Sequence, residues 1–220
     1  MKLNLKSKTI IKAKSIIRTI YWEVFDSYSK FIEFFQAMLE KRKGLDFATQ
    51  VNDRQLGYKQ SPYQSYQTGG MKRLIKILEK LKINKNDSVL DVGSGKGKSL
   101  YTLTKFPFNN VDGVEMSSEL CEIAKNNLEK LNVNMNRINI YISDATLLTN
   151  LDKYNYFFLS NPFNGAPMET FIENVKKSYY SVPRKIVVIY FYPWCNNMFI
   201  NSGIFKEYMS FKRYKVYKTK

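Results

Sequence analysis

The sequence predicts an α/β fold arranged around one strand–turn–helix unit, and three observations support this. An apolar run at residues 88–92 leads into glycines at alternate positions, and a helical pattern follows them. Further apolar runs alternate with helical patterns between residues 110 and 192, which is typical of a parallel sheet with helical crossovers. Glycines let a ligand approach the backbone closely, and the start of a helix offers unpaired N–H groups.

The spacing of the glycines leaves three kinds of ligand site to weigh. The dinucleotide fingerprint is G-x-G-x-x-G, whereas Gly93, Gly95 and Gly97 follow G-x-G-x-G. Residues 97–99 match the end of the phosphate loop G-x-x-x-x-G-K-[ST], but Gly93 leaves that loop one residue short, so ATP binding is the second interpretation. The third is Asp-x-Gly-x-Gly-x-Gly after a strand, where Asp91 organises the turn and the ammonium group of S-adenosylmethionine.

The composition bounds the class of protein. The chain has 220 residues, 44% apolar and 25% charged, which suits one main domain with an attachment. Its net charge of +16 favours anionic partners such as nucleic acid, and a generally lysine-rich composition is the alternative explanation. The absence of histidine excludes Ser-His-Asp and Cys-His catalysis. Two cysteines cannot form a zinc site, so we expect no metal and a cytoplasmic protein with reduced thiols.

Residues 1–45 are predicted to form a basic amphipathic helical extension. Apolar residues recur at helical spacing from about residue 9 to residue 43, and Gly44 is a suitable end. Packing on the main domain is the favoured role, and peripheral contact with an anionic membrane is the alternative. No apolar run reaches the roughly 18 residues of a membrane span, so no transmembrane segment is expected.

Residues 89–100, Val-Leu-Asp-Val-Gly-Ser-Gly-Lys-Gly-Lys-Ser-Leu, resemble motif I of the class I, seven-stranded methyltransferases. The resemblance implies a Rossmann-like, seven-stranded, mostly parallel sheet with helices on both faces, formed by residues 71–220. It also implies S-adenosylmethionine as cofactor and S-adenosylhomocysteine as product. The motif residues expected to bind the cofactor are Asp91, Gly93, Ser94, Gly95 and Gly97.

The predicted elements follow from local patterns. The helix after the glycines stops before Phe106 because the residue preceding a proline avoids the helical region. Ser117 is a suitable cap for the next helix, and the lysines of the final hairpin suit a solvated edge strand. Predicted strands are Ser88–Val92, Asn110–Met116, Ile138–Ile142, Tyr154–Ser160 and Lys185–Tyr192, with a hairpin at Phe205–Tyr217; helices are predicted near residues 71–81, 100–105, 117–131 and 168–181.

Two acids follow predicted strands. Glu115 ends the second strand, 24 residues after Asp91, and its two oxygens can accept hydrogen bonds from both ribose hydroxyls. It resembles the motif II acid of the family, and Met116 beside it is expected to pack on adenine. By resemblance, Asp144 accepts from the adenine amino group with the Ala145 backbone near the ring; capping of a helix by Asp144 is the alternative.

The fourth strand ends in Asn161-Pro162-Phe163, at the topological switch of the expected sheet, where ligands bind. The tripeptide resembles motif IV of amino-methylating enzymes, although the second proline of that motif is missing. In the family the Asn accepts hydrogen bonds from the target nitrogen and the aromatic ring stacks on a planar base. Asn161 is also expected to contact the cofactor, because the segment lies beside the methyl donor. A turn-forming Asn before proline is the alternative. Beyond the fifth strand, Tyr192 and Trp194 are expected either to line the acceptor pocket or to pack in the core.

Residues 46–70 are rich in Tyr and Gln and are interpreted as a lid. A loose similarity to non-SET lysine methyltransferases makes Tyr66 and Thr68 the candidates for contact with substrate and cofactor; a surface loop is the alternative. The predicted function is methyl transfer to a nitrogen of a protein side chain, with lysine as the candidate. Methylation of nucleic acid or a small molecule, and ligand binding without turnover, are the alternatives.

Overall fold

The computed structural model describes residues 34–35, 37–47, 71–211 and 213–220. The chain divides into two units, Met1–Gly44 and Leu45–Lys220. In the first unit the described residues are helical up to residue 42, and Gly44 adopts a left-handed φ of 69°, as expected of a glycine that ends a helix. The predicted helix before residue 34, and the candidates Tyr66 and Thr68, lie outside the described residues.

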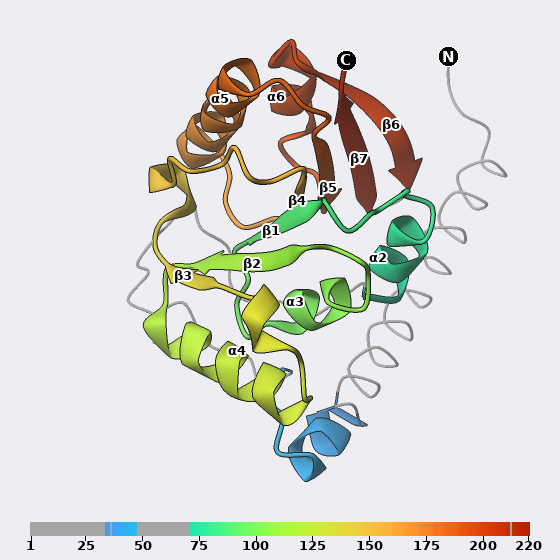
Figure 1. Ribbon diagram of the computed structural model, residues 1–220, viewed down its shortest axis with the longest axis vertical. Coiled ribbons are helices and arrows are strands. Elements are labelled where there is room, and N and C mark those ends of the chain that lie inside the picture. Colours follow the sequence, from blue (N-terminus) through green and yellow to red (C-terminus); the bar gives the residue numbers. More distant parts are fainter. Residues whose placement is uncertain (1–33, 36, 48–70, 212) are drawn as a thin grey trace, which may run out of the picture. The chain divides into compact units, whose positions relative to one another are not determined.

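The second unit contains a seven-stranded sheet in the order β3-β2-β1-β4-β5-β7-β6 (Figure 1). Strands β1 to β5 are mutually parallel, whereas β7 pairs antiparallel with both β5 and β6. The strands are β1 Ser88–Val92, β2 Asn110–Glu115, β3 Ile140–Ile142, β4 Tyr156–Ser160, β5 Val187–Phe191, β6 Phe205–Phe211 and β7 Tyr214–Thr219. The helices are α2 Met71–Leu78, α3 Lys98–Leu103, α4 Ser118–Lys130, α5 Ala166–Ser181 and α6 Asn196–Asn201.

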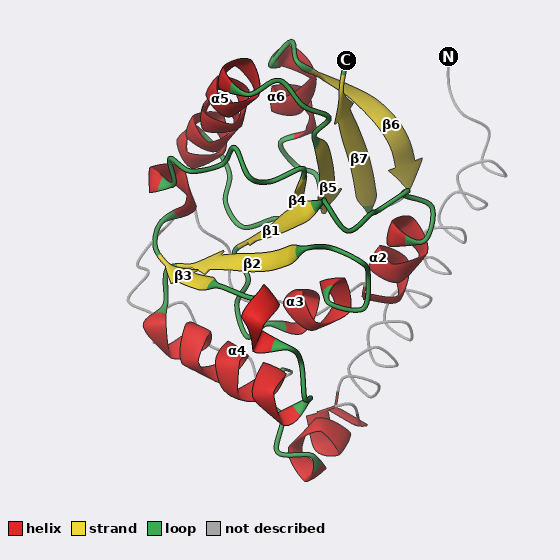
Figure 2. Ribbon diagram, in the orientation of Figure 1, coloured by secondary structure: helices red, strands yellow, loops and turns green. Residues whose placement is uncertain are grey.

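Helices cover both faces of the sheet, as Figure 2 shows. Apolar residues of α2, α3 and α4 pack on one face, and those of α5 and α6 pack on the other. Strand β5 is buried along its whole length, which explains why it reads as a continuous apolar run. Strand β1 is equally buried although it contains Ser88 and Asp91. The predicted α/β, Rossmann-like sheet with helices on both faces is therefore confirmed. None of the described helices is long and apolar enough to cross a membrane.

The strand order reverses between β1 and β4. From β1 the chain moves outward through β2 and β3, and it then returns to place β4 and β5 on the other side of β1. The carboxyl ends of β1 and β4 therefore lie side by side, with Val92 paired to Leu159. Ligands of open α/β sheets bind at such a switch point, so the segments that follow these two strands form the candidate site.

Several predicted bounds were wrong by a few residues. Strand β3 starts at Ile140 rather than Ile138, because a 3₁₀ turn at Met135–Arg137 precedes it and Ile138 caps that turn. Strand β4 starts at Tyr156 because Tyr154 belongs to a turn in which its N–H donates to the carbonyl of Leu151. The short helix α6 was not predicted. The final hairpin extends to Thr219, and its strand β6 is at the edge of the sheet, as predicted.

Candidate active site

The turn between β1 and α3 depends on left-handed glycines. Gly93, Gly95 and Gly97 have φ values of 75°, 51° and 83°, which side chains other than glycine rarely adopt. The N–H groups of Gly93 and Ser94 donate to the Val114 carbonyl at 2.9 and 3.1 Å. The turn is thus attached to the carboxyl end of β2 while the start of α3 faces the switch point.

Close packing also requires these glycines. A Cβ placed on Gly93 would lie 2.9 Å from the Cβ of Pro162, and one on Gly97 would lie 3.0 Å from the Cβ of Ala124. The first contact brings the glycine turn after β1 directly against the Asn161-Pro162-Phe163 segment after β4. Gly93 and Asn161 are 68 positions apart in the sequence. The fold brings their two motifs together in one site.

Asp91 is fully buried at the end of β1. The Ser99 hydroxyl donates to its Oδ2, whereas its Oδ1 is buried without a hydrogen-bond partner among the described residues. Burial raises the pKa of Asp91 to about 7; the Ser99 hydrogen bond acts in the opposite direction, and Glu115 adds to the rise. A buried acceptor without a donor is costly, so a cationic or N–H-bearing ligand group at Oδ1 would satisfy it.

Glu115 joins the carboxyl end of β2 to the glycine turn. Its Oε2 accepts from the Gly95 N–H at 3.0 Å, and its Oε1 accepts from the N–H groups of Met116 and Ser117 at 2.8 and 3.1 Å. Burial raises the pKa of Glu115, against the opposing effect of these hydrogen bonds. The carboxylate is held in a fixed orientation, and its expected contact with ribose hydroxyls remains a prediction, as does packing of the half-buried Met116 on adenine.

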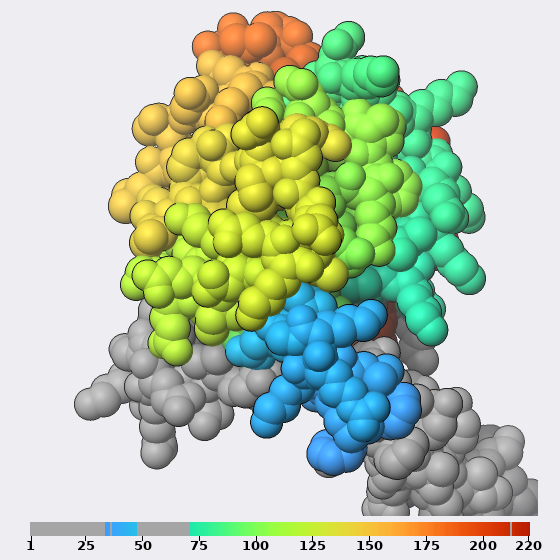
Figure 3. Space-filling view, turned by 60° about the horizontal axis from the view of Figure 1, so that its bottom comes forward, coloured from blue at the N-terminus to red at the C-terminus, as the bar shows by residue number. Residues whose placement is uncertain are grey.

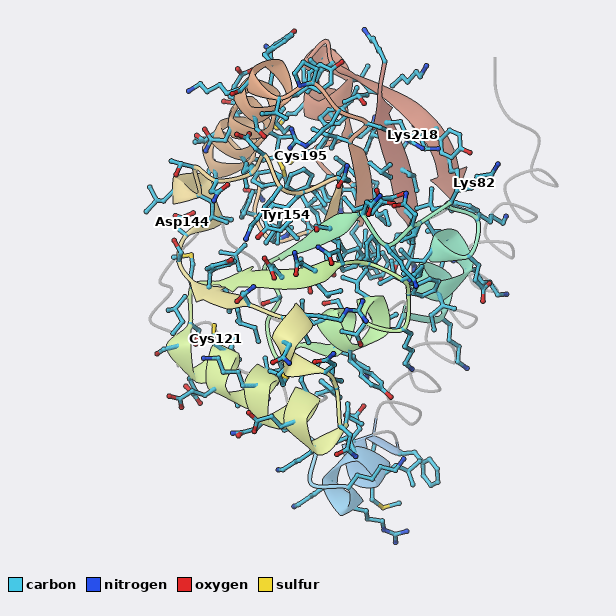
Figure 4. The ribbon with its side chains drawn as sticks, viewed as in Figure 1. Lys82, Cys121, Asp144, Tyr154, Cys195 and Lys218 are labelled. Carbon is cyan, nitrogen blue, oxygen red and sulfur yellow. The ribbon has the colours of Figure 1, made fainter. Side chains whose placement is uncertain are left out.

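Asp144 follows β3 and begins a 3₁₀ turn at Ala145–Leu147 (Figure 4). Its Oδ1 accepts from both the N–H and the hydroxyl of Thr146 at 2.8 Å, so capping is one role of this side chain. Ala145 is 5% exposed and packs in the core. The expected contacts of these two residues with an adenine ring remain predictions.

Asn161 follows β4 in a strained conformation. Its φ is 51°, its side chain is buried, and its Oδ1 accepts from the Tyr190 hydroxyl at 3.4 Å. Tyr192, which follows the neighbouring strand β5, has a φ of 50°, and each of these two residues precedes a proline. Non-glycine residues in the left-handed region cluster at functional sites, so two of them on adjacent strand ends support a site here.

Phe163 and Trp194 differ sharply in exposure. The Phe163 ring is 2% exposed and lies edge-on to Phe171, with ring centroids 6.0 Å apart, so it belongs to the core. The Trp194 side chain is 70% exposed just beyond β5, whereas Tyr192 packs on Phe191. Tyr192 and Trp194 were expected either to line the acceptor pocket or to pack in the core. Tyr192 packs against the core, and Trp194 does not. Contact of Phe163 with an acceptor remains a prediction.

Sequence reasoning missed two buried charged clusters. Lys96, inside the glycine turn, is 1% exposed and pairs with Asp46 at 2.7 Å; nothing in the local pattern signals a partner 50 residues away. Asp112, in the middle of β2, accepts from the Tyr154 hydroxyl at 2.7 Å and from Lys153 at 3.1 Å. The second cluster connects β2 to the segment that precedes β4. The presence of an acid within an otherwise apolar strand could have indicated it from the sequence.

The residues around the turn fit a ligand with an amino-acid portion and a ribose. The orphaned Asp91 Oδ1 suits an ammonium group, and the oriented Glu115 carboxylate suits hydroxyls. The part of the chain that the structure describes contains no group of three or more Cys, Asp or Glu residues arranged to hold a metal ion. The space-filling view shows one face of the molecule, where the chain around α4, in yellow-green, and the segment leading into β3, in yellow, form much of the surface (Figure 3).

The sheet order and the glycine turn after β1 are those of the α/β, Rossmann-like methyltransferase fold. Residues 83–191 match the family model described as "Methyltransferase domain", a range that includes β1 to β5 and all candidate residues from Asp91 to Phe163. The match favours the methyltransferase interpretation of the glycine turn over the ATP interpretation.

Individual proteins of known activity are also similar to this chain in sequence or in structure. The chain is 34% identical over 102 residues to EEF1A lysine methyltransferase 2 of Mus musculus, covering 43% of this chain and 41% of that protein. It is 40% identical over 52 residues to an rRNA adenine N-6-methyltransferase of Limosilactobacillus reuteri, covering 24% and 21%. The chain thus spans less than half the length of these curated relatives. A solved S-adenosylmethionine-dependent O-methyltransferase of Thermotoga maritima shares the fold, with a TM-score of 0.55, 16% identity and coverage of 70% and 66%.

Proposed function

We propose that this protein transfers a methyl group from S-adenosylmethionine to a nitrogen of a protein side chain, with lysine as the candidate acceptor. The observation that carries the proposal is the contact between the glycine turn and the Asn161-Pro162-Phe163 segment through Pro162. The cofactor site and a polar side chain suited to a nitrogen acceptor are therefore adjacent. The similarity to the mouse EEF1A lysine methyltransferase 2 supports a protein acceptor.

The chemistry required of the protein is mainly alignment. Bound S-adenosylmethionine supplies a methyl group on a sulfonium, whose departure leaves a neutral thioether. Asp91 would hold the donor through its ammonium group and Glu115 through its ribose hydroxyls, and Asn161 would orient the nucleophile. Holding two reactants in attack geometry supplies a large part of a rate enhancement.

Tyr190 contacts the Asn161 side chain that is proposed to orient the nucleophile. Burial raises the pKa of Tyr190 far above its usual range, so its hydroxyl stays protonated and acts as a donor. It donates to the Asn161 Oδ1 over 3.4 Å, and a second lone pair of that oxygen is left for an N–H of the acceptor. A lysine acceptor, whose free pKa is about 10.4, must lose a proton before attack. The predicted role of Tyr66 is to contact the acceptor amine and to assist that loss.

The surface beyond β5 suits a protein acceptor. Ser160 and Phe191 are paired in register, so Asn161 and Tyr192 follow neighbouring strand ends. Trp194 lies two residues further and exposes its indole. An indole can pack against the aliphatic stem of a long side chain and attract its ammonium group through the ring face, which would guide a lysine toward Asn161.

Methylation of nucleic acid is the second candidate function. The net charge of +16 and the similarity to the Limosilactobacillus rRNA adenine N-6-methyltransferase favour it. The burial of Phe163 in the core weighs against it, because a ring in that position cannot stack on a base without leaving its packing with Phe171.

The test incubates purified protein with S-adenosylmethionine tritiated on the methyl group and a lysate of its own host. Protease-sensitive label that is absent with Asn161→Ala is the expected result, and mass spectrometry then locates the modified side chain. Asn197→Ala, at an exposed position of α6, is the matched control and should label normally. Label removed by nuclease would establish the second function, and label resistant to both treatments would indicate a small-molecule or lipid acceptor.

A further inference from the structure

A charged side chain is buried inside the glycine turn, where the proposed reaction gives it no role. Lys96 lies between Gly95 and Gly97 and is 1% exposed. Its ammonium group forms an ion pair with Asp46 at 2.7 Å, whose side chain is 39% exposed. A buried ammonium is costly unless it is paired, so the conformation of the turn depends on the segment that carries Asp46.

Asn127 of α4 ties the same two segments together through their backbones. Its Nδ2 donates to the carbonyls of Asp46 and Lys96 at 3.0 and 3.1 Å, and its Oδ1 accepts from the Asp46 N–H at 2.9 Å. Asn127 is 2% exposed, so these bonds are shielded from water. A residue of the chain before α2 is thereby fixed to the middle of the turn.

The residues beside Asp46 anchor the segment. Leu45 and Phe47 are 8% and 3% exposed, and the Lys98 ammonium lies 5.8 Å from the centre of the Phe47 ring. The backbone of the turn is held on its other side, where the Gly95 N–H donates to Glu115. Position 95 is therefore held by β2, and position 96 by α4 and residue 46.

We propose that Asp46 and Asn127 are positioning residues of the cofactor site, and that residues 45–47 belong to the cofactor-binding unit together with the glycine turn. The proposal rests on the proposed function, since it assigns the turn to S-adenosylmethionine. Neutralising Asp46 removes the carboxylate that lies 2.7 Å from an almost fully buried ammonium, and this loss of electrostatic stabilisation loosens the turn. Neutralising Lys96 instead leaves a carboxylate that is already partly hydrated.

This difference in burial predicts an asymmetric pair of variants. Asp46→Asn is expected to weaken S-adenosylmethionine binding about tenfold, a small part of the penalty for breaking a buried ion pair. Lys96→Met should change binding by less than about threefold, and the double variant D46N/K96M should recover most of the lost affinity, because replacing both partners of a buried pair is often neutral.

The experiment titrates S-adenosylmethionine into each full-length variant by isothermal calorimetry, at a temperature where far-ultraviolet circular dichroism shows all of them folded. Thermal midpoints are recorded separately, so that a loss of stability is not read as a loss of affinity. Asp46→Glu should retain most of the binding. Glu173→Gln removes an exposed ion pair with Lys176 on α5 and should bind as the wild type does.

Each outcome decides between named alternatives. No binding by the wild-type protein would refute the proposed function itself, together with this inference. Wild-type binding with an unchanged Asp46→Asn affinity would refute the positioning role alone, as would a double variant as weak as Asp46→Asn. If Asp46→Asn does not fold, Asn127→Ala takes its place: it removes the backbone ties, and we expect about fivefold weaker binding, whereas unchanged affinity would overturn the proposal.

Discussion

Gly113 in β2 is the position where a single methyl group should disturb the cofactor site most directly. A Cβ placed there would lie 2.7 Å from the Ser94 Oγ, 2.9 Å from the Ser94 Cβ and 3.1 Å from the Leu100 Cδ1. Ser94 belongs to the glycine turn and is 2% exposed, so it has little room to move. Gly113→Ala therefore pushes the turn away from β2.

The magnitude follows from the cost of overpacking. Extra methyl groups in a packed core typically cost about 1–3 kcal/mol, which for a chain of this size lowers the thermal midpoint by a few to about 10 °C. If about 1.4 kcal/mol of the strain must be overcome to restore the turn on binding, S-adenosylmethionine affinity falls about tenfold. Calorimetric titration and thermal unfolding measure the two effects separately.

Two variants test whether the clash with Ser94 is the cause. Adding Ser94→Gly to Gly113→Ala removes both of the closest atoms and should restore most of the midpoint. Gly203→Ala is the control: no atom lies within 4 Å of the position its Cβ would take, but its φ of 83° makes the alanine strained, so stability should fall by about 1–2 kcal/mol with affinity unchanged. A Gly113→Ala protein with wild-type stability and affinity would refute the packing argument.

Three further predictions concern the site. Because burial raises the pKa of Asp91 from 3.8 to about 7, the folded ligand-free protein retains a proton that the unfolded chain has released. Its stability should therefore fall as pH rises from about 4 to 7, by up to about 1.4 kcal/mol per unit, and Asp91→Asn should remove this slope in urea unfolding. Asn161→Ala should lower kcat at least about 100-fold with cofactor affinity nearly unchanged, because it removes orientation rather than donor binding. Trp194→Ala should raise the acceptor KM about tenfold, with kcat less affected.

Each of these three predictions has its own control or its own contradicting result. For Asp91, equal pH slopes in the wild type and the variant would show that its carboxyl titrates normally in the folded protein. For Asn161, a large loss of cofactor affinity would place its role in donor binding instead. For Trp194, the matched control is Tyr180→Ala, which removes an aromatic side chain that is 64% exposed near the end of α5; equal effects of the two variants on KM would exclude a local acceptor contact.

The central strands could be predicted from the sequence because their local pattern and their burial agree. Strand β1 has the predicted bounds Ser88–Val92, since its apolar run is enclosed by a turn and by glycines. Helix α6, at Asn196–Asn201, was missed because only Phe199 among its six residues is buried, so no apolar periodicity marks it. The start of β4 was predicted too early because tyrosine is common in strands. Tyr154 instead lies before the strand, and its hydroxyl donates a hydrogen bond to Asp112.

The left-handed backbone of the glycine turn could be predicted from the sequence, whereas the side-chain partners in the candidate site could not. The glycines were recognisable because a left-handed turn favours this residue, and Asn161 was singled out only by its resemblance to motif IV; its φ of 51° was not predicted. The orphaned oxygen of Asp91 and the ion pair between Lys96 and Asp46 depend on burial and on contacts far apart in the chain. No local spacing encodes such contacts, so they emerge only from the folded structure.

Binding of S-adenosylmethionine to the full-length wild-type protein tests the central claim most directly. Calorimetry near pH 7.5, where Asp91 is largely ionised, should give one site per chain with micromolar affinity, and Asp91→Ala should abolish it. ATP titrated under the same conditions should give no binding. Heat from ATP but none from S-adenosylmethionine would contradict the assignment of the glycine turn, and with it the proposed methyl transfer.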